Sequence, residues 1–182
     1  MSSSILRESL LRSERVFEGR LLSVRKDTVQ SRRIGTITRE VVEHPGAVGI
    51  VPLSDQSEII MVEQYRHAVG KYLLEIPAGT LEREETPINC ARRELLEETG
   101  FQASRFRRLL RCYLAPGYSS ELITIYEATG LKSRSRAPAP DENLKVRRLE
   151  LKNVLEMIHR NHIKDAKTIC GIFALIGSRH EA

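Results

Sequence analysis

The sequence predicts an α+β fold in which helices flank a mixed, largely antiparallel sheet. Short β-branched runs separated by turn residues fill most of residues 17–76, and a segment of helical period with clear start and stop signals follows at 86–100. Further strand-like runs and two more helical segments complete the chain. With 182 residues, 41% of them hydrophobic, the chain has the size and composition of one globular protein with one core.

The first quarter of the chain predicts a helix and then strands. Residues 1–15 indicate a frayed or loosely docked helix. From Phe17 the pattern changes to β-branched runs at 21–24 and 36–42, and the second run alternates as a half-buried strand does. We expect these two runs to form antiparallel strands.

After a turn at His44, three strand-like runs follow, at 47–53, 58–65 and 72–76. The first is almost continuously apolar and suits a central strand. A polar turn at 55–57 separates the first two runs, which we expect to pair as a hairpin. Pro77 ends the third run.

A helix is predicted from residue 87 to 99. Thr86 is expected to cap its start through the hydroxyl group, and Pro87 suits the first helical position because its missing N–H costs nothing there. Gly100 supplies a left-handed cap at the end. The residues expected to share the inward face are Ile88, Ala91 and Leu95.

The rest of the chain predicts strands, one loop and two helices. The strands are expected at 108–114, 122–129 and 144–149, the loop at 133–140, and the helices at 153–161 and 165–178. The loop is rich in Ser, Arg, Pro and Ala, which favours irregular structure.

Charge is unevenly distributed along the chain, whose formal net charge is +5. Residues 75–101 carry seven acidic and three basic side chains, whereas residues 102–152 carry five acidic and eleven basic ones. An acidic cluster flanked by arginines suits a divalent cation and a phosphate-rich small molecule better than nucleic acid. A solvated surface of mixed charge is the alternative.

No segment predicts a membrane span or a secretory signal. The longest apolar stretch, 169–176, falls far short of the roughly 20 residues that cross a bilayer. The three cysteines have no metal-type spacing and are typical of reduced core residues. These features predict a cytoplasmic protein without a membrane partner.

Three glutamates lie near the end of the predicted helix. Glu94 and Glu98 are four residues apart and share one face, with Glu97 close by. Carboxylates here repel one another and oppose the helix dipole, so a cation should compensate them. Clustered hard oxygen ligands suit Mg²⁺, with Mn²⁺ as a further option. The alternative is a solvated acidic face paired with Arg92 and Arg93.

The wider spacing resembles a known family signature. From Gly79 the chain shows five residues, Glu85, seven residues, and then Arg-Glu-Leu, one residue, Glu-Glu, one residue and Gly-Phe. This pattern resembles the Nudix box in every specified position, and a chance match is on the order of one in a hundred million. The resemblance implies a Nudix-type α/β/α sandwich with a loop-helix-loop metal site. It also implies hydrolysis of a nucleoside diphosphate linked to another group, in a domain at 46–182 with the box at 79–101.

Segments outside the box resemble the ADP-ribose pyrophosphatase branch of that family. They are residues 39–48, 62–66, 74–79, 115–121 and 165–168. The resemblance implies metal-dependent cleavage of the pyrophosphate bond of ADP-ribose to AMP and ribose 5-phosphate. Relatives that cleave GDP-mannose share much of this frame, so GDP-mannose or another nucleotide sugar is the alternative substrate.

The same resemblance assigns roles within and beside the box. It implies that Glu94, Glu98 and the backbone carbonyl of Ala78 bind the metal, and that Glu97 assists or binds a further ion. Arg93 matches the arginine that orients the box carboxylates. The two residues expected to shape the box are Gly79, by allowing a tight approach of loop and helix, and Glu85, as a brace.

Residues outside the box are expected to bind the substrate and to activate water. Arg66 matches an arginine that reaches the pyrophosphate, and Arg39 matches one near the nucleotide. Glu121 is a candidate for the ribose end, with a surface salt bridge as its alternative role. Glu142 matches a loop glutamate that contacts metal and water, so it is the candidate general base and a metal ligand, with Asp141 in reserve.

The sequence favours two other functions less. A non-catalytic nucleotide-sugar sensor has little need of all three box glutamates. An RNA-processing enzyme is disfavoured because five Tyr, four Phe and no Trp leave no aromatic-rich basic strip for stacking bases. The resemblance also implies a homodimer, since members of this branch commonly exchange N-terminal strands, and residues 1–45 resemble such an extension.

Overall fold

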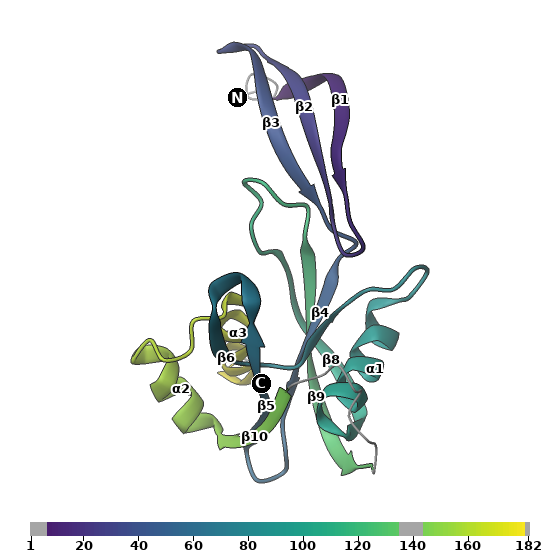
Figure 1. Cartoon of the computed structure of the whole chain (residues 1–182). Coiled ribbons are helices and arrows are strands. Elements are labelled where there is room, and N and C mark those ends of the chain that lie inside the picture. Colours follow the sequence, from purple (N-terminus) through teal and green to yellow (C-terminus); the bar gives the residue numbers. More distant parts are fainter. Residues whose placement is uncertain (1–6, 135–143, 181–182) are drawn as a thin grey trace. The chain divides into compact units, whose positions relative to one another are not determined.

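The computed structural model describes residues 7–134 and 144–180. The chain divides into two compact units, residues 1–46 with 113–122 and residues 47–112 with 123–182 (Figure 1). Among the described residues, no helix is both long enough and apolar enough to span a membrane.

The first unit is built on an antiparallel sheet with the strand order β1-β2-β3. The strands are β1 (Glu8–Glu18), β2 (Ser23–Ser31) and β3 (Gly35–Glu43). The pairing of β2 with β3 confirms the two antiparallel strands expected here. The first of them begins two residues later than expected and runs to Ser31. A turn at residues 32–34 then reverses the chain into β3, whose first residue, Gly35, has a φ of +84°.

The helix predicted over residues 1–15 is wrong for the described part of that segment, which is strand β1. This strand pairs antiparallel with β2 along its whole length. The strand is favoured because β2 supplies partners for its backbone N–H and C=O groups. Side chains also join the two strands, since Ser13 donates a hydrogen bond of 2.6 Å to Asp27. Such pairing is non-local, so the composition of the segment alone did not reveal it.

The second unit contains two sheets, with the strand orders β7-β4-β9-β8 and β10-β5-β6. Their strands are β4 (Ala47–Pro52), β5 (Glu58–Arg66), β6 (Lys71–Glu75), β7 (Ala78–Thr80), β8 (Phe101–Tyr113), β9 (Leu122–Ser133) and β10 (Leu144–Glu150). β4 runs parallel to β9 and antiparallel to β7, which confirms a mixed sheet. The short strand β7 has no counterpart among the predicted strands.

The expected hairpin of β4 and β5 does not form. The two strands belong to different sheets, and an isolated antiparallel bridge between Leu53 and Ile59 joins their ends. Because β4 has β7 on one edge and β9 on the other, no edge is left for β5. A tight turn, in which the Ser54 N–H donates to the Glu58 carbonyl, passes the chain from one sheet to the other.

Helix α1 (Pro87–Thr99) coincides with the predicted helix. Pro87 occupies the first turn, and Gly100 ends the helix in the left-handed conformation at a φ of 71°. The expected hydroxyl cap is wrong, because the Thr86 side chain makes no capping hydrogen bond. Thr86 is exposed, so water competes for the hydroxyl, and its backbone carbonyl accepts N–H groups of the first turn instead.

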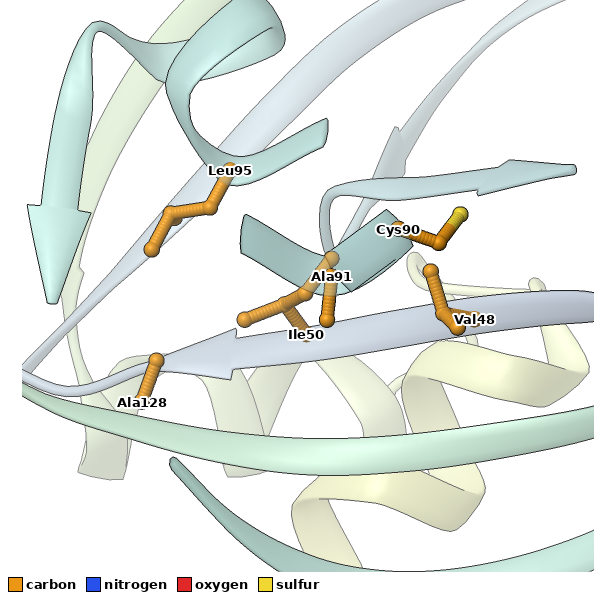
Figure 2. Close-up of a cluster of buried hydrophobic side chains, with 6 residues drawn as sticks. All are labelled: Val48, Ile50, Cys90, Ala91, Leu95 and Ala128. Carbon is orange, nitrogen blue, oxygen red and sulfur yellow. The ribbon is translucent and has the colours of Figure 1, made fainter. Parts of the chain in front are cut away.

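One face of α1 packs on β4 and forms part of the core (Figure 2). The fully buried side chains of this cluster are Val48, Ile50, Cys90, Ala91, Leu95 and Ala128. The expected inward positions of Ala91 and Leu95 are confirmed. Ile88 is only partly buried, and the small thiol of Cys90 fills the inner position nearest the start of the helix.

Helices α2 (Leu151–His159) and α3 (Ala166–His180) follow β10, and α2 begins two residues earlier than expected. At Gly171, α3 comes so close to β4 that an added Cβ would lie 3.0 Å from Cγ2 of Val51. Val51 and Ile50 are neighbours on one strand and point to opposite faces. The sheet therefore lies between α1 and α3, as in an α/β/α sandwich.

Candidate active site

At Gly79, strand β7 contacts the α1 face that carries Glu94 and Glu98. A Cβ added to Gly79 would lie 1.9 Å from Oε1 of Glu94, so only glycine leaves room for that carboxylate. Glu94 and Glu98 are 9% and 8% exposed, which is rare for carboxylates without partners. The structure thus brings β7 and α1 together around two nearly buried acids.

Arg93 lies at the centre of the acidic cluster. Its Nε and Nη2 donate to the two oxygens of Glu85 at 3.0 and 2.9 Å. Its Nη1 donates to Glu94 at 2.6 Å and to Glu97 at 3.1 Å. A third carboxylate contact of this kind needs the planar, multi-donor guanidinium, which lysine lacks. Arg93 therefore fixes the carboxylates of Glu85, Glu94 and Glu97 relative to one another.

These contacts shift the pKa values of both partners. The hydrogen bond from Arg93 outweighs desolvation and lowers the pKa of Glu85 to about 2. In turn, the bond to Glu85 and the charge of Glu94 raise the pKa of Arg93. Glu85 and Arg93 are therefore both charged at neutral pH and form an ion pair.

Cys90 lies beneath this cluster but is unsuited to nucleophilic chemistry. Burial, with the nearby charge of Glu85, raises the pKa of its thiol to about 12. Its Sγ contacts the carbonyl of Thr80 at 3.5 Å. The residue acts as a small core side chain, as its sequence context predicts.

A backbone hydrogen bond ties Glu98 to strand β7. The N–H of Ala78 donates to Oε2 of Glu98 at 3.0 Å. Ala78 itself lies in β7, opposite Gly49 of β4. The central sheet thereby fixes the position of Ala78, whose carbonyl is the expected backbone metal ligand, next to the carboxylate of Glu98.

The donor set of this site is all oxygen, which fits a hard divalent cation. Within the described residues, no three His, Cys, Asp or Glu side chains converge closely enough to hold a metal ion in the present arrangement. Two of the box carboxylates point to Arg93 instead, so this guanidinium compensates part of their charge. The chemistry and burial of these carboxylates fit a hard divalent cation.

Arg66 belongs to a second charged cluster, which the sequence did not single out. It binds Glu75 through Nε at 2.9 Å and Nη2 at 2.7 Å, and Lys167 donates to the same carboxylate. Glu75 and Lys167 are buried. Glu75 within the otherwise apolar run 73–76 could have indicated this cluster from sequence, because a charged residue in a buried strand implies an oppositely charged partner.

The other expected site residues lie elsewhere in the chain. Arg39 is in β3 of the first unit and pairs with Glu8 of β1. Glu121 is in the 113–122 segment of that unit and is partly exposed. Glu142 and Asp141 lie outside the described residues. The substrate contacts of Arg39 and Glu121 and the base assignment to Glu142 stay predictions.

The helix-flanked mixed sheet and the carboxylates gathered around Arg93 together define the Nudix class of proteins. A profile of the NUDIX domain matches residues 43–170 of the chain. The chain therefore belongs to the NUDIX family.

Similar proteins share most of the chain's length. An ADP-ribose pyrophosphatase of Mycobacterium tuberculosis is 39% identical over 90% of this chain and 80% of its own length. A methanol dehydrogenase activator of Bacillus methanolicus is 36% identical over 92% of each chain. A GDP-mannose pyrophosphatase of Shigella flexneri is 30% identical over 72% of this chain and 73% of its own. The crystal structure of an ADP compounds hydrolase matches with a TM-score of 0.84 at 25% identity, covering 97% of this chain and 96% of that one.

Proposed function

We propose that the protein hydrolyses the pyrophosphate bond of ADP-ribose to AMP and ribose 5-phosphate in a divalent-metal-dependent reaction. The observation that carries the proposal is the box itself, in which Arg93 joins Glu85, Glu94 and Glu97 in one charged cluster, beside a strand position that only glycine can occupy without displacing Glu94. Similarity to ADP-ribose pyrophosphatases over most of the chain supports the substrate.

Mg²⁺ is the proposed ion, held by Glu94, Glu98 and the Ala78 carbonyl, with Glu97 assisting. When bound, such an ion offsets charge on the pyrophosphate and lowers the pKa of the attacking water. Arg93 and Glu85 keep the carboxylates oriented for this task. The general base is proposed to be Glu142.

Arg66 is the proposed contact to the pyrophosphate. Its side chain is 39% exposed, and it interacts electrostatically with Glu98 of the box. Arginine suits this contact because its planar fork can bond two phosphate oxygens at once. Arg39 and Glu121 are proposed for the nucleotide and the ribose, and the homodimer and cytoplasmic location stay predictions.

The proposal is tested by offering ADP-ribose, GDP-mannose, NADH, diadenosine polyphosphates and capped RNA side by side to the purified full-length chain with Mg²⁺. We expect equimolar AMP and ribose 5-phosphate from ADP-ribose as the fastest reaction, its loss on chelation by EDTA, and its return with added Mg²⁺. Faster cleavage of GDP-mannose would move the substrate to the alternative. Tight binding of ADP-ribose without any turnover would identify a sensor.

A further inference from the structure

The carboxylate of Glu75 is only 1% exposed and accepts from cations on two different elements. Arg66 reaches it from β5 and Lys167 from α3, and Asp165 contacts Lys167 at 3.0 Å. Burial alone raises the pKa of Glu75, but the hydrogen bonds and charges of Arg66 and Lys167 outweigh it and hold the pKa below its ordinary value. Glu75 is therefore a buried carboxylate that holds the side chains of Arg66 and Lys167 in place.

Glu75 occupies one edge of the Arg66 guanidinium. The fork to Glu75 uses Nε and Nη2 of Arg66, at 2.9 and 2.7 Å. A guanidinium has a second edge, formed by Nη1 and the other Nη2 hydrogen, with the geometry to bind two oxygens of a phosphate. The side chain is 39% exposed even with the first edge engaged. Arg66 can thus bind Glu75 and a phosphate at the same time.

Glu75 is also the first of four consecutive residues that are each fixed to another element. The N–H of Ile76 donates to Oγ1 of Thr168 at 2.9 Å, and the carbonyl of Pro77 accepts from Ile50 at 2.8 Å. The N–H of Ala78 donates to Glu98 at 3.0 Å. This anchored segment, 75–78, connects the Arg66 fork to the box through a short and rigid stretch of backbone.

We propose that Glu75 is a positioning residue, which holds Arg66 by one edge so that the other edge meets the diphosphate of the substrate, while Lys167 anchors Glu75. The proposal rests on the proposed function for the identity of that substrate. A different role makes the opposite prediction: if Glu75 only neutralised Arg66, its removal would free positive charge and strengthen diphosphate binding.

A double-mutant cycle on kcat/KM for ADP-ribose tests the proposal. We expect Glu75→Gln to lower kcat/KM by about tenfold or more, mainly through KM, because a misdirected guanidinium loses its phosphate contact. In an Arg66→Ala background, the same change should cost less than about twofold, because nothing is left to position. Additive losses, or a lower KM for Glu75→Gln, would overturn the proposal.

Glu63→Gln is the matched control. Glu63 lies on the same strand as Arg66 and pairs with Arg147 at 2.7 Å, but successive side chains alternate along β5 and place it on the opposite face. We expect kcat/KM within about twofold of the parent chain. Should Glu75→Gln fail to fold by circular dichroism, Glu75→Asp takes its place, since it keeps the charge and withdraws the fork by one methylene.

Calorimetric binding of inorganic pyrophosphate with Mg²⁺ separates this proposal from the proposed function. If the parent chain does not cleave ADP-ribose but Glu75→Gln weakens pyrophosphate binding and Glu63→Gln does not, the positioning role stands and the substrate assignment fails. If ADP-ribose is cleaved and Glu75→Gln leaves both turnover and pyrophosphate binding unchanged, the function stands and the positioning role is refuted.

Discussion

Arg93 binds Glu85, Glu94 and Glu97 at once, and its Nη2 also lies 3.3 Å from the Thr80 carbonyl. Single substitutions around it should therefore have large and distinct effects. The sequence identified Arg93 and its three acidic partners because the box is contiguous and its spacing is specific. The sequence alone could not distinguish these ion pairs from a solvated acidic face, because both interpretations place the same residues on the same helix.

Glu85→Gln should change how stability depends on pH. The pKa of Glu85 is lowered from 4.5 to about 2 by its hydrogen bond with Arg93. A group whose pKa is lower in the folded state adds stability above its ordinary pKa and loses it as the pH falls toward the folded value. We expect urea unfolding in EDTA to show a stability gap between parent chain and variant at pH 7 that narrows progressively below 4.5. A gap that stays constant with pH would contradict this ion pair.

Gly79→Ala should displace the Glu94 carboxylate, because the added Cβ would lie 1.9 Å from Oε1. The added Cβ would also lie 2.0 Å from Cδ and 2.5 Å from Cγ of Glu94, so this side chain must move aside, and we expect a folded protein with kcat reduced by about a hundredfold. The control is Gly177→Ala on α3, where an added Cβ meets nothing within 4 Å. A kcat equal to that of the parent chain for Gly79→Ala would show that catalysis does not require the Glu94 carboxylate to lie against Gly79 of β7.

The elements differ in how far local sequence determines them. Helix α1 was predicted to the residue because Pro87 and Gly100 act through their own backbone preferences. β1 and the β4–β5 connection were mispredicted because both depend on which strand edges are available, and that is a property of the assembled sheets. Helix caps are only partly determined by local sequence. Thr86 is a residue type favoured at the position before a helix, yet its side chain makes no capping hydrogen bond to α1.

The two helix starts give a direct comparison. Thr86→Ala should cost less than about 0.5 kcal/mol of unfolding free energy, since the hydroxyl makes no capping bond. Asp165→Ala, in contrast, should cost at least about 0.5–2 kcal/mol, because Asp165 accepts the Thr168 N–H at 3.0 Å at the start of α3 and also pairs with Lys167. Both are measured by urea unfolding at neutral pH. Equal losses would mean that Thr86 does cap α1 in solution.

At the scale of the whole molecule, the sequence led to the family and to the box but not to the Arg66 cluster. Glu75 and Lys167 are 92 residues apart, and their contact forms only after α3 packs on the sheet. Segments 74–79 and 165–168 each resemble the ADP-ribose pyrophosphatase branch, yet no spacing rule in the sequence connects them. Long-range ion pairs of this kind carry no local pattern, unlike the box.

The N-terminal unit exposes apolar side chains of β1, among them Leu10, Val16 and Phe17. Exposed groups of this kind favour an interface. We expect light scattering of the full-length chain to give twice the chain mass of 20.7 kDa. Deletion of residues 1–45 should yield a monomer or an aggregate with weaker substrate binding. A full-length mass equal to one chain would exclude the dimer.

If Glu94 and Glu98 hold the metal for hydrolysis, as we propose, the decisive measurement is the rate of ADP-ribose cleavage by Glu98→Gln in Mg²⁺. This change removes a charge at an 8% exposed position and preserves the side chain's shape. We predict a folded protein, verified by an unchanged circular dichroism spectrum, whose kcat is lower by at least about a hundredfold. A folded variant with near-normal turnover would contradict the account.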